Sequence, residues 1–156
     1  MNAEHIKPFV QGTQAIMASV CGENMNVGKM FVKAHPYKCE HAAISVQISG
    51  DVKGNVIYTM AEGTALAAAS KMMGGMPVAG LDDMSRSALE ELANMISSQA
   101  AMLFSGMGLK VSVTAPVFHV NAGEGSFPFL QPDSKLICIP LTCQDGSVFE
   151  VDLLLI

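Results

Sequence analysis

The stretch from about Asp83 to Phe104 is the feature that most constrains how this chain can fold. On a helix, positions i, i+4, i+7 and i+11 lie within about 60° of one another. The polar residues of the stretch have this spacing, and its apolar residues gather on the opposite side. Such a helix must bury its apolar face against another layer. The apolar side consists of Leu89, Leu92, Ala93, Ile96, Ala100 and Leu103, and the polar line consists of Ser87, Glu91, Asn94 and Ser98.

A β pattern earlier in the chain predicts the layer that the helix covers. Between Ala42 and Met60, Ile44, Val46 and Ile48 alternate with polar residues, which is the period-two pattern of a strand. A glycine-rich turn over residues 50–54 then leads to a second apolar run, so the two runs form a hairpin. Further strands are predicted over Gly28 to Lys33, Lys110 to Thr114, Val117 to Asn121, Lys135 to Thr142 and Ser147 to Leu155.

Two other segments are predicted to be helical. The first runs from about Glu4 to Cys21 and stops at Gly22, and the second is short and Ala-rich, from Glu62 to Met73. Asp82 or Asp83 is expected to cap the long helix, because a carboxylate accepts the free N–H groups of its first turn. No linker or repeat divides the chain. The sequence therefore predicts one α+β domain over residues 1–156, with a mostly antiparallel sheet and two long helices packed on it.

Composition excludes several classes of function. The formal net charge is -5, with 9 basic against 14 acidic residues, which argues against a nucleic-acid-binding surface or a membrane-binding helix. No apolar run approaches the roughly 20 residues that span a bilayer, and the N-terminus does not resemble a signal peptide. The four cysteines form no CxxC pair and are expected to be reduced and mostly buried. These features predict a cytoplasmic protein.

The polar line of the long helix suggests a particular chemistry. An Asn amide both donates and accepts hydrogen bonds, so Asn94 can hold a water molecule in a chosen orientation. Glu91 can pair with a lysine of a partner, and neither residue is an obvious nucleophile. The pair suits phosphoryl transfer in which the metal is supplied elsewhere. The flanking residues favour docking against another protein, because they are small or apolar rather than charged; they are Ala88, Met95, Ala101 and Met102.

The spacing Ser87-x3-Glu91-x2-Asn94, followed after 21 residues by Pro116, resembles the signature of the CheC/CheX family of chemotaxis phosphatases. The surroundings are similar to the CheX type, which carries one copy of the motif. The segments that carry this similarity are Gly50-Asp-Val-Lys-Gly-Asn-Val-Ile-Tyr58 and Glu90-Glu-Leu-Ala-Asn-Met-Ile96. The resemblance covers most of the chain and is strongest between residues 41 and 117.

The resemblance implies a function as well as a fold. Members dephosphorylate the phospho-aspartate of CheY-type response regulators. Asn94 would orient the attacking water, and Glu91 would engage the active-site lysine of the regulator. Mg²⁺ would belong to the partner, and this chain would carry no cofactor or metal of its own. Ser87, Glu90 and Ser98 would contact the partner, and Pro116 would shape the neighbouring strand. A homodimer formed by joined sheets is also implied.

Other candidate sites are weaker. Ser19-x3-Glu23-x2-Asn26 matches the short motif, but Gly22 interrupts the helix there and no proline follows at the right distance. His35, Cys39 and His41 make only three potential zinc ligands, so a structural role is favoured. No phosphate-binding GxxxxGK[ST] loop and no GxSxG nucleophile motif occurs.

Two rival functions stay open at this point. The same helix face would serve a non-catalytic module that binds a response regulator or a component of the flagellar switch. A small-molecule-binding domain that uses the loop from Ala122 to Asp133, which contains two Pro and two Gly, is the other alternative.

Overall fold

Eight strands pair into one curled sheet in the computed structural model, which describes residues 2–156 of the chain. The strand order is β1-β7-β8-β4-β3-β5, while β2 also pairs with β7 and β6 also pairs with β3. Every pairing is antiparallel. The strands are β1 (Asn26–Val27), β2 (Phe31–Lys33), β3 (Ala42–Gly50), β4 (Gly54–Met60), β5 (Val111–Val113), β6 (Val117–Val120), β7 (Leu136–Thr142) and β8 (Val148–Leu155).

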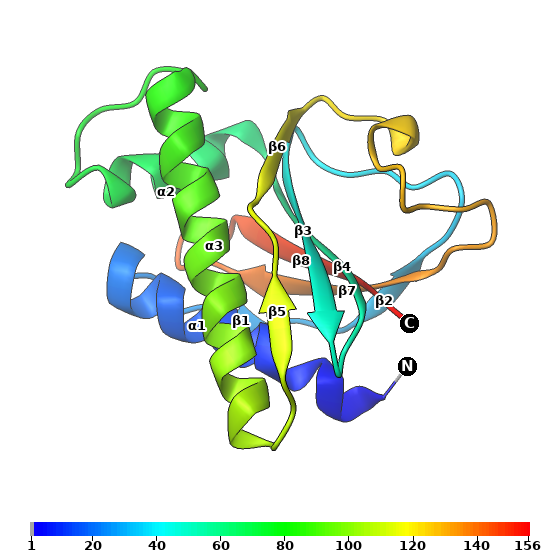
Figure 1. Cartoon of the computed structure of the whole chain (residues 1–156). Helices are drawn as coiled ribbons and strands as arrows, with labels where there is room; N and C mark the ends of the chain where they lie inside the picture. The colour runs from blue at the N-terminus through cyan, green and yellow to red at the C-terminus, as the bar shows by residue number, and fades with distance from the viewer. Residues whose placement is uncertain (1) are drawn as a thin grey trace.

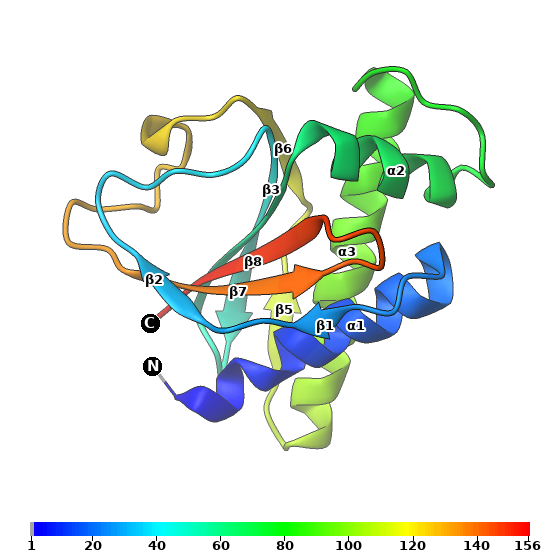
Figure 2. The same ribbon diagram turned by 180° about the vertical axis from the view of Figure 1, so that it is seen from behind.

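The helices α1 (Lys7–Cys21), α2 (Glu62–Met72) and α3 (Asp83–Gly106) lie on one side of this sheet (Figures 1 and 2). The connecting segments 34–41 and 121–135 lie on the other side. Single 3-10 turns, η1 (Ala3–His5) and η2 (Glu124–Ser126), precede α1 and interrupt the second segment. Within residues 2–156, no helix is both long enough and apolar enough to cross a bilayer. The predicted fold class, a single α+β domain with helices on an antiparallel sheet, is confirmed.

The β3–β4 hairpin forms the centre of the core. Its register pairs Ala42 with Met60 and Ile48 with Gly54, so the alternating apolar residues of β3 point together toward the helices. β4 is buried along nearly its whole length, on both faces. The reason is that its second face, which includes Ile57, packs under the segments on the far side of the sheet. The sheet therefore carries one large core beneath the helices and a smaller one beneath those segments.

α1 and α3 approach each other closely because α1 has a glycine at the contact. A Cβ atom on Gly12 would lie 3.2 Å from both the Ala100 nitrogen and the Ile96 oxygen of α3. Nearby, the rings of Phe9 and Phe104 meet edge to face at 5.7 Å between centroids, and both side chains are fully buried. The backbone contact thus sets how near α3 lies to α1.

The strand predicted over Gly28 to Lys33 is wrong in its detail. β1 ends at Val27 and β2 starts at Phe31, and both pair with β7. The break lies opposite Pro140, whose nitrogen carries no hydrogen and cannot donate to a neighbouring strand. Gly28 still donates its N–H to the Pro140 carbonyl at 2.7 Å.

The prediction of which residues of the long helix are buried is also wrong at its C-terminal end. Leu103 is only half-buried, whereas Phe104 is fully buried against Phe9. The other five apolar residues of the predicted stripe are buried as expected.

Replacing Gly12 by Ala tests the close approach of the two helices. Ala is favoured over Gly in a helix by roughly 0.5–1 kcal/mol, so Gly63→Ala in α2, where a Cβ would meet nothing within 4 Å, should raise the free energy of unfolding. In urea denaturation, the free energy of unfolding of Gly12→Ala should be lower than that of Gly63→Ala by about 1–2 kcal/mol, because backbone atoms of α3 must move. Equal stabilisation by both substitutions would contradict the contact.

Candidate functional site

The N-terminus of α3 is fixed by a side-chain cap. Asp82 Oδ1 accepts hydrogen bonds from both the backbone N–H and the hydroxyl of Ser85, each at 2.9 Å. These bonds, the backbone one foremost, hold the pKa of Asp82 below its usual range. Of the two predicted capping residues, Asp82 is therefore the cap, and Asp83 begins the helix.

The rotation of α3 is set by what its inner face buries. Leu89, Leu92 and Ile96 are at most 1% exposed against the sheet core. One polar contact adds to this packing: the Tyr58 hydroxyl of β4 lies 2.7 Å from the Ser97 hydroxyl, and both side chains are fully buried. Burial raises the pKa of Tyr58, so the phenol stays protonated and can donate. The opposite side of α3 consequently faces away from the core.

The outward side of α3 borders a hollow of about 320 Å³. Its second wall is the connection between β5 and β6, which runs beside α3 in Figure 1. The lining residues are Ser87, Glu90, Glu91, Asn94, Ala115 and Pro116.

The hollow is acidic. Two of its six lining residues are glutamates, and none is a lysine or arginine. Among residues 2–156, no ion pair involves Glu90 or Glu91. The nearest cation along α3, Arg86, is occupied elsewhere: its guanidinium lies 5.7 Å from the centre of the Phe118 ring, and its Nε donates to the Leu81 carbonyl. A cationic group from another molecule would be attracted here, whereas an anion would need to bring its own counter-charge.

The lining side chains suit some reactions and not others. An amide and a carboxylate can hold water and a cation in fixed positions. The lining includes neither histidine nor cysteine, so Ser87 has no imidazole base beside it in the hollow. The arrangement therefore favours positioning of a water molecule over covalent catalysis.

Most of the residues singled out from the sequence come together here. Ser87, Glu90, Glu91 and Asn94 share the hollow with Pro116, although a different part of the chain supplies the proline. Ser87 and Glu91 are exposed, while Asn94 is half-buried. Ser98 lies one turn further along α3, is half-buried and does not line the hollow. Of the flanking apolar residues, Met102 is 68% exposed, whereas Ala88, Met95 and Ala101 are half-buried.

The second match to the motif, Ser19-x3-Glu23-x2-Asn26, does not form a comparable face. α1 ends at Cys21 with Gly22 in the left-handed region, at φ 67°. Glu23 lies beyond the helix and is buried, where its carboxylate accepts hydrogen bonds from Lys71 and from the backbone of Gln144. This glutamate links three segments of the fold.

The histidines and the cysteine considered as zinc ligands make loop contacts instead. His35 Nδ1 lies 2.6 Å from Glu124, and His41 contacts both Asn121 and Glu62. Cys39 donates to the Ala122 carbonyl. The contacts with Glu124, Asn121 and Ala122 fasten segment 34–41 to segment 121–135, and the contact with Glu62 joins it to α2.

The loop from Ala122 to Asp133 is anchored as well. Phe127 is 1% exposed and packs against Tyr37 at 5.6 Å between ring centres. The loop covers the face of the sheet opposite the helices, away from the hollow.

Two features were missed from the sequence. Ala115 lines the hollow, but no property of an alanine marks it in advance. Cys138, Glu150 and Asp152 gather on the other face of the sheet, and only the pairing of β7 with β8 brings Cys138 opposite Asp152. Cross-strand neighbours of this kind are not apparent from sequence spacing.

Comparison with known proteins identifies the family. The family model of the chemotaxis phosphatase CheX matches residues 42–141. The CheY-P phosphatase CheX of Thermotoga maritima is 32% identical over 117 residues, which make up 74% of this chain and 75% of that protein. This chain belongs to the CheX family of chemotaxis phosphatases. It is accordingly a phosphatase, that is, a hydrolase.

Solved CheX structures share the fold. The chemotaxis protein CheX of Desulfovibrio desulfuricans has a TM-score of 0.83 and 25% identity, covering 98% of this chain and 99% of that one. A CheX–CheY–BeF3–Mg²⁺ complex from Borrelia burgdorferi gives a TM-score of 0.77 at 24% identity, covering 97% of each chain. The layered arrangement of sheet and helices is thus common to these CheX proteins.

Removing the cap of the site helix should cost stability. Asp82→Ala is expected to lower the free energy of unfolding by about 1 kcal/mol, because it leaves first-turn N–H groups unpaired. Asp83→Ala, a neighbouring carboxylate without a capping bond, should cost only a few tenths of a kcal/mol. Urea denaturation of both variants measures the difference, and equal losses would show that Asp82 acts through its charge alone.

Proposed function

We propose that this chain hydrolyses the aspartyl phosphate of a CheY-type response regulator in chemotaxis signalling, with α3 inserted at the phosphorylation site of the regulator. The observation that carries the proposal is the acidic hollow, where Glu91 and Asn94 lie side by side with Pro116 and without a cation. The name of the Thermotoga maritima relative supports CheY-P as the substrate. The complex from Borrelia burgdorferi, which contains CheY and Mg²⁺, supports a CheY-like partner that holds the metal.

In the proposed reaction this chain positions the attacking water molecule. The carbonyl oxygen of the Asn94 amide accepts a hydrogen bond from a water molecule and aligns it with the phosphorus atom. As the water oxygen bonds to phosphorus, the bond between phosphorus and the aspartyl oxygen breaks and the aspartate leaves as a carboxylate. The protons of the water remain with the inorganic phosphate or pass to solvent. Mg²⁺ on the regulator would hold the phosphoryl oxygens. The chain needs no cofactor of its own for this step.

The charges of the hollow support the proposed role of Glu91. CheY-type regulators carry a lysine at the active site, according to the family resemblance, and Glu91 would pair with it. Glu90 would add to the attraction, while Ser87 would contact the partner at the start of the helix. Ser98 would contact the partner beyond the hollow. Pro116 would shape the opposite wall and take no part in chemistry.

Replacing Asn94 tests the catalytic assignment. Asn94→Ala should lower kcat by about 100-fold, because the attacking water loses its alignment, while binding of the phosphorylated regulator stays nearly unchanged. Phosphate release and complex formation are measured separately, and Ser105→Ala, on the same helix but two turns beyond Ser98, serves as the matched control. An Asn94→Ala protein as fast as the wild type would remove Asn94 from the mechanism.

The same assays distinguish the rival function. A module that only binds a regulator would form the complex without speeding phosphate release for any of several phosphorylated regulators from the same cell.

Glu91 should affect binding as well as turnover. Glu91→Ala is expected to weaken the complex by roughly tenfold or more, and Glu91→Lys should weaken it further, because a lysine repels the lysine of the regulator. Titration of the regulator with each variant, at low and high salt, measures the effect. If Glu91→Lys bound as tightly as the wild type, the proposed ion pair would be wrong.

We also propose that the chain forms a homodimer and that it acts in the cytoplasm, the compartment of the proposed substrate. β1 and β2 form an edge of the sheet with exposed apolar side chains: Val27, Met30, Phe31 and Val32 are 42–55% exposed. Beside them, a hollow of about 600 Å³ lies between α1 and β1. Such an edge favours pairing with a second copy, since an unpaired apolar edge strand is otherwise prone to uncontrolled association.

Charge on this edge should separate the subunits of the proposed dimer. Val32→Lys is expected to shift the wild-type dimer to monomer in sedimentation experiments, because a buried lysine at a subunit contact would lack a partner. Val148→Lys is the control, since Val148 is comparably exposed (41%) but lies on β8, which β7 separates from β1 and β2. A dimer unaffected by Val32→Lys would place the contact elsewhere.

A further inference from the structure

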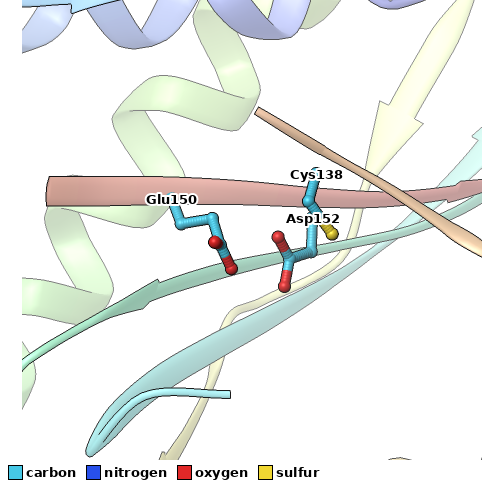
Figure 3. Close-up of side chains that lie close together, drawn as sticks. All are labelled: Cys138, Glu150 and Asp152. Carbon is cyan, nitrogen blue, oxygen red and sulfur yellow. The ribbon is translucent and has the colours of Figure 1, made fainter. Parts of the chain in front are cut away.

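A cluster of charged and polar side chains lies on the sheet face that the helices do not cover. Glu150 and Asp152 extend from β8, Cys138 from β7 and Lys33 from the end of β2. Figure 3 shows the carboxylates of Glu150 and Asp152 turned toward each other, with the sulfur of Cys138 beside Asp152. Tyr37, in segment 34–41, covers the cluster, and its hydroxyl donates a hydrogen bond of 2.6 Å to Asp152 Oδ2.

The hydrogen bonds of Asp152 are unevenly shared between its two oxygens. Lys33 Nζ lies 2.5 Å from Glu150 Oε2 and 3.3 Å from Asp152 Oδ2, which is also the oxygen bonded to Tyr37. Asp152 Oδ1 has no hydrogen-bond partner among the described residues, although the side chain is fully buried. A buried carboxylate oxygen without a donor costs free energy, because water no longer solvates it.

The charges are unbalanced as well. One ammonium group, that of Lys33, serves two carboxylates. Burial, and then the charge of Asp152, raise the pKa of Glu150 to about 7. Burial likewise raises the pKa of the Cys138 thiol, with Asp152 adding to the effect, so the thiol is protonated. With both carboxylates ionised, the cluster therefore carries more negative than positive charge, and an additional cation or proton would be attracted to it.

The ligand atoms are spaced for a single metal ion. Cys138 Sγ, one Glu150 oxygen and one Asp152 oxygen all lie within 4.8 Å of one another. Around tetrahedral zinc the corresponding distances are about 3.4–3.6 Å, so shifts of roughly 1 Å would close the site. One thiolate with two carboxylates suits zinc better than Mg²⁺ or Ca²⁺, which prefer oxygen ligands alone. From the shared position of these three side chains and the unpartnered oxygen of Asp152, we propose that Cys138, Glu150 and Asp152 form a zinc site.

Binding is balanced in atoms and charge. The S–H bond of Cys138 breaks and its proton passes to solvent as the sulfur–zinc bond forms. Water would occupy the fourth position. Lys33 gives up its contacts with the two carboxylates, because zinc and the ammonium group compete for the same oxygens. The cluster keeps one net negative charge, since the zinc ion and the new thiolate together replace the single charge of Lys33. Lys33 can move away, since it ends an edge strand and its side chain is 21% exposed.

One of the three proposed ligands, Glu150, borders solvent, while Cys138 and Asp152 are fully buried. Glu150 lines a surface hollow of about 150 Å³ that it shares with Glu40, Thr59 and Ser147. The zinc site lies across the sheet from the α3 hollow, so the two are independent, and the bound ion would join β7 to β8 without touching the phosphatase reaction.

Zinc titration of the full chain tests the proposal. The protein is treated with EDTA, dialysed in reducing buffer and titrated with ZnCl2 by calorimetry. One zinc should bind per chain and raise the melting temperature. Cys138→Ser and Glu150→Gln should each weaken binding by at least tenfold, while Lys33→Met should tighten it, because a competing cation is removed. Cys39→Ser, a neighbouring thiol outside the ligand set, should bind as the wild type does.

A spectroscopic measurement keeps the test independent of stability. Co²⁺ bound in place of zinc should give a thiolate-to-metal charge-transfer band in the wild type and in Cys39→Ser, and none in Cys138→Ser. Absence of saturable zinc binding, or an unchanged cobalt band in Cys138→Ser, would overturn the site.

A proton is the alternative to a metal as the neutralising charge, and it gives a different result. Because the pKa of Glu150 is raised by folding, a protonated Glu150 stabilises the fold below the ordinary glutamate pKa, and this contribution is lost as the pH rises toward 7. The melting temperatures of the wild type and Glu150→Gln are compared in EDTA as the pH rises, and then in zinc without EDTA. If the melting temperature of the wild type fell relative to that of Glu150→Gln over that pH range, and zinc changed neither value, a proton would occupy the cluster and the zinc proposal would be wrong.

Discussion

The packing of α3 between α1 and the sheet is the interaction on which the rest of the structure depends. Leu89, Leu92, Ile96 and Phe104 are buried in one line along this helix. Burying each such side chain contributes roughly 1.5–3 kcal/mol, so together they rival the net stability of a typical domain. Turning α3 about its axis would expose them, and the direction of every outward side chain follows from this constraint.

The sheet separates two regions with different chemistry. On the helix side, an exposed acidic hollow presents Glu91 and Asn94 toward solvent. On the other side, segments 34–41 and 121–135 enclose a small apolar core together with the cluster around Asp152. β4 lies between the two, which explains why it is buried on both faces. A protein with one covered face would not need such a strand at its centre, nor could it shelter charged groups behind it.

Local patterns were sufficient for most of the elements. The three helices, the β3–β4 hairpin and the last two strands depend on periodicity, glycines and caps, which are properties of neighbouring residues. The errors occur where a distant residue decides the outcome. Pro140 interrupts the pairing of the first edge strand, and Phe9 draws Phe104 into the core in place of Leu103. Neither effect can be seen within the segment that it alters.

The same division applies to the functional residues. Helical spacing by itself determined that Ser87, Glu91 and Asn94 lie along one side of α3, because residues three or four apart on a helix share a face whatever surrounds it. The apolar residues on the opposite side of the helix already predicted that this side faces outward. Tertiary structure alone decided that Ala115 and Pro116 close the hollow beside it and that Cys138 meets Asp152. Those contacts join residues far apart in the chain, and only the packing of the helices and the register of the sheet bring them together.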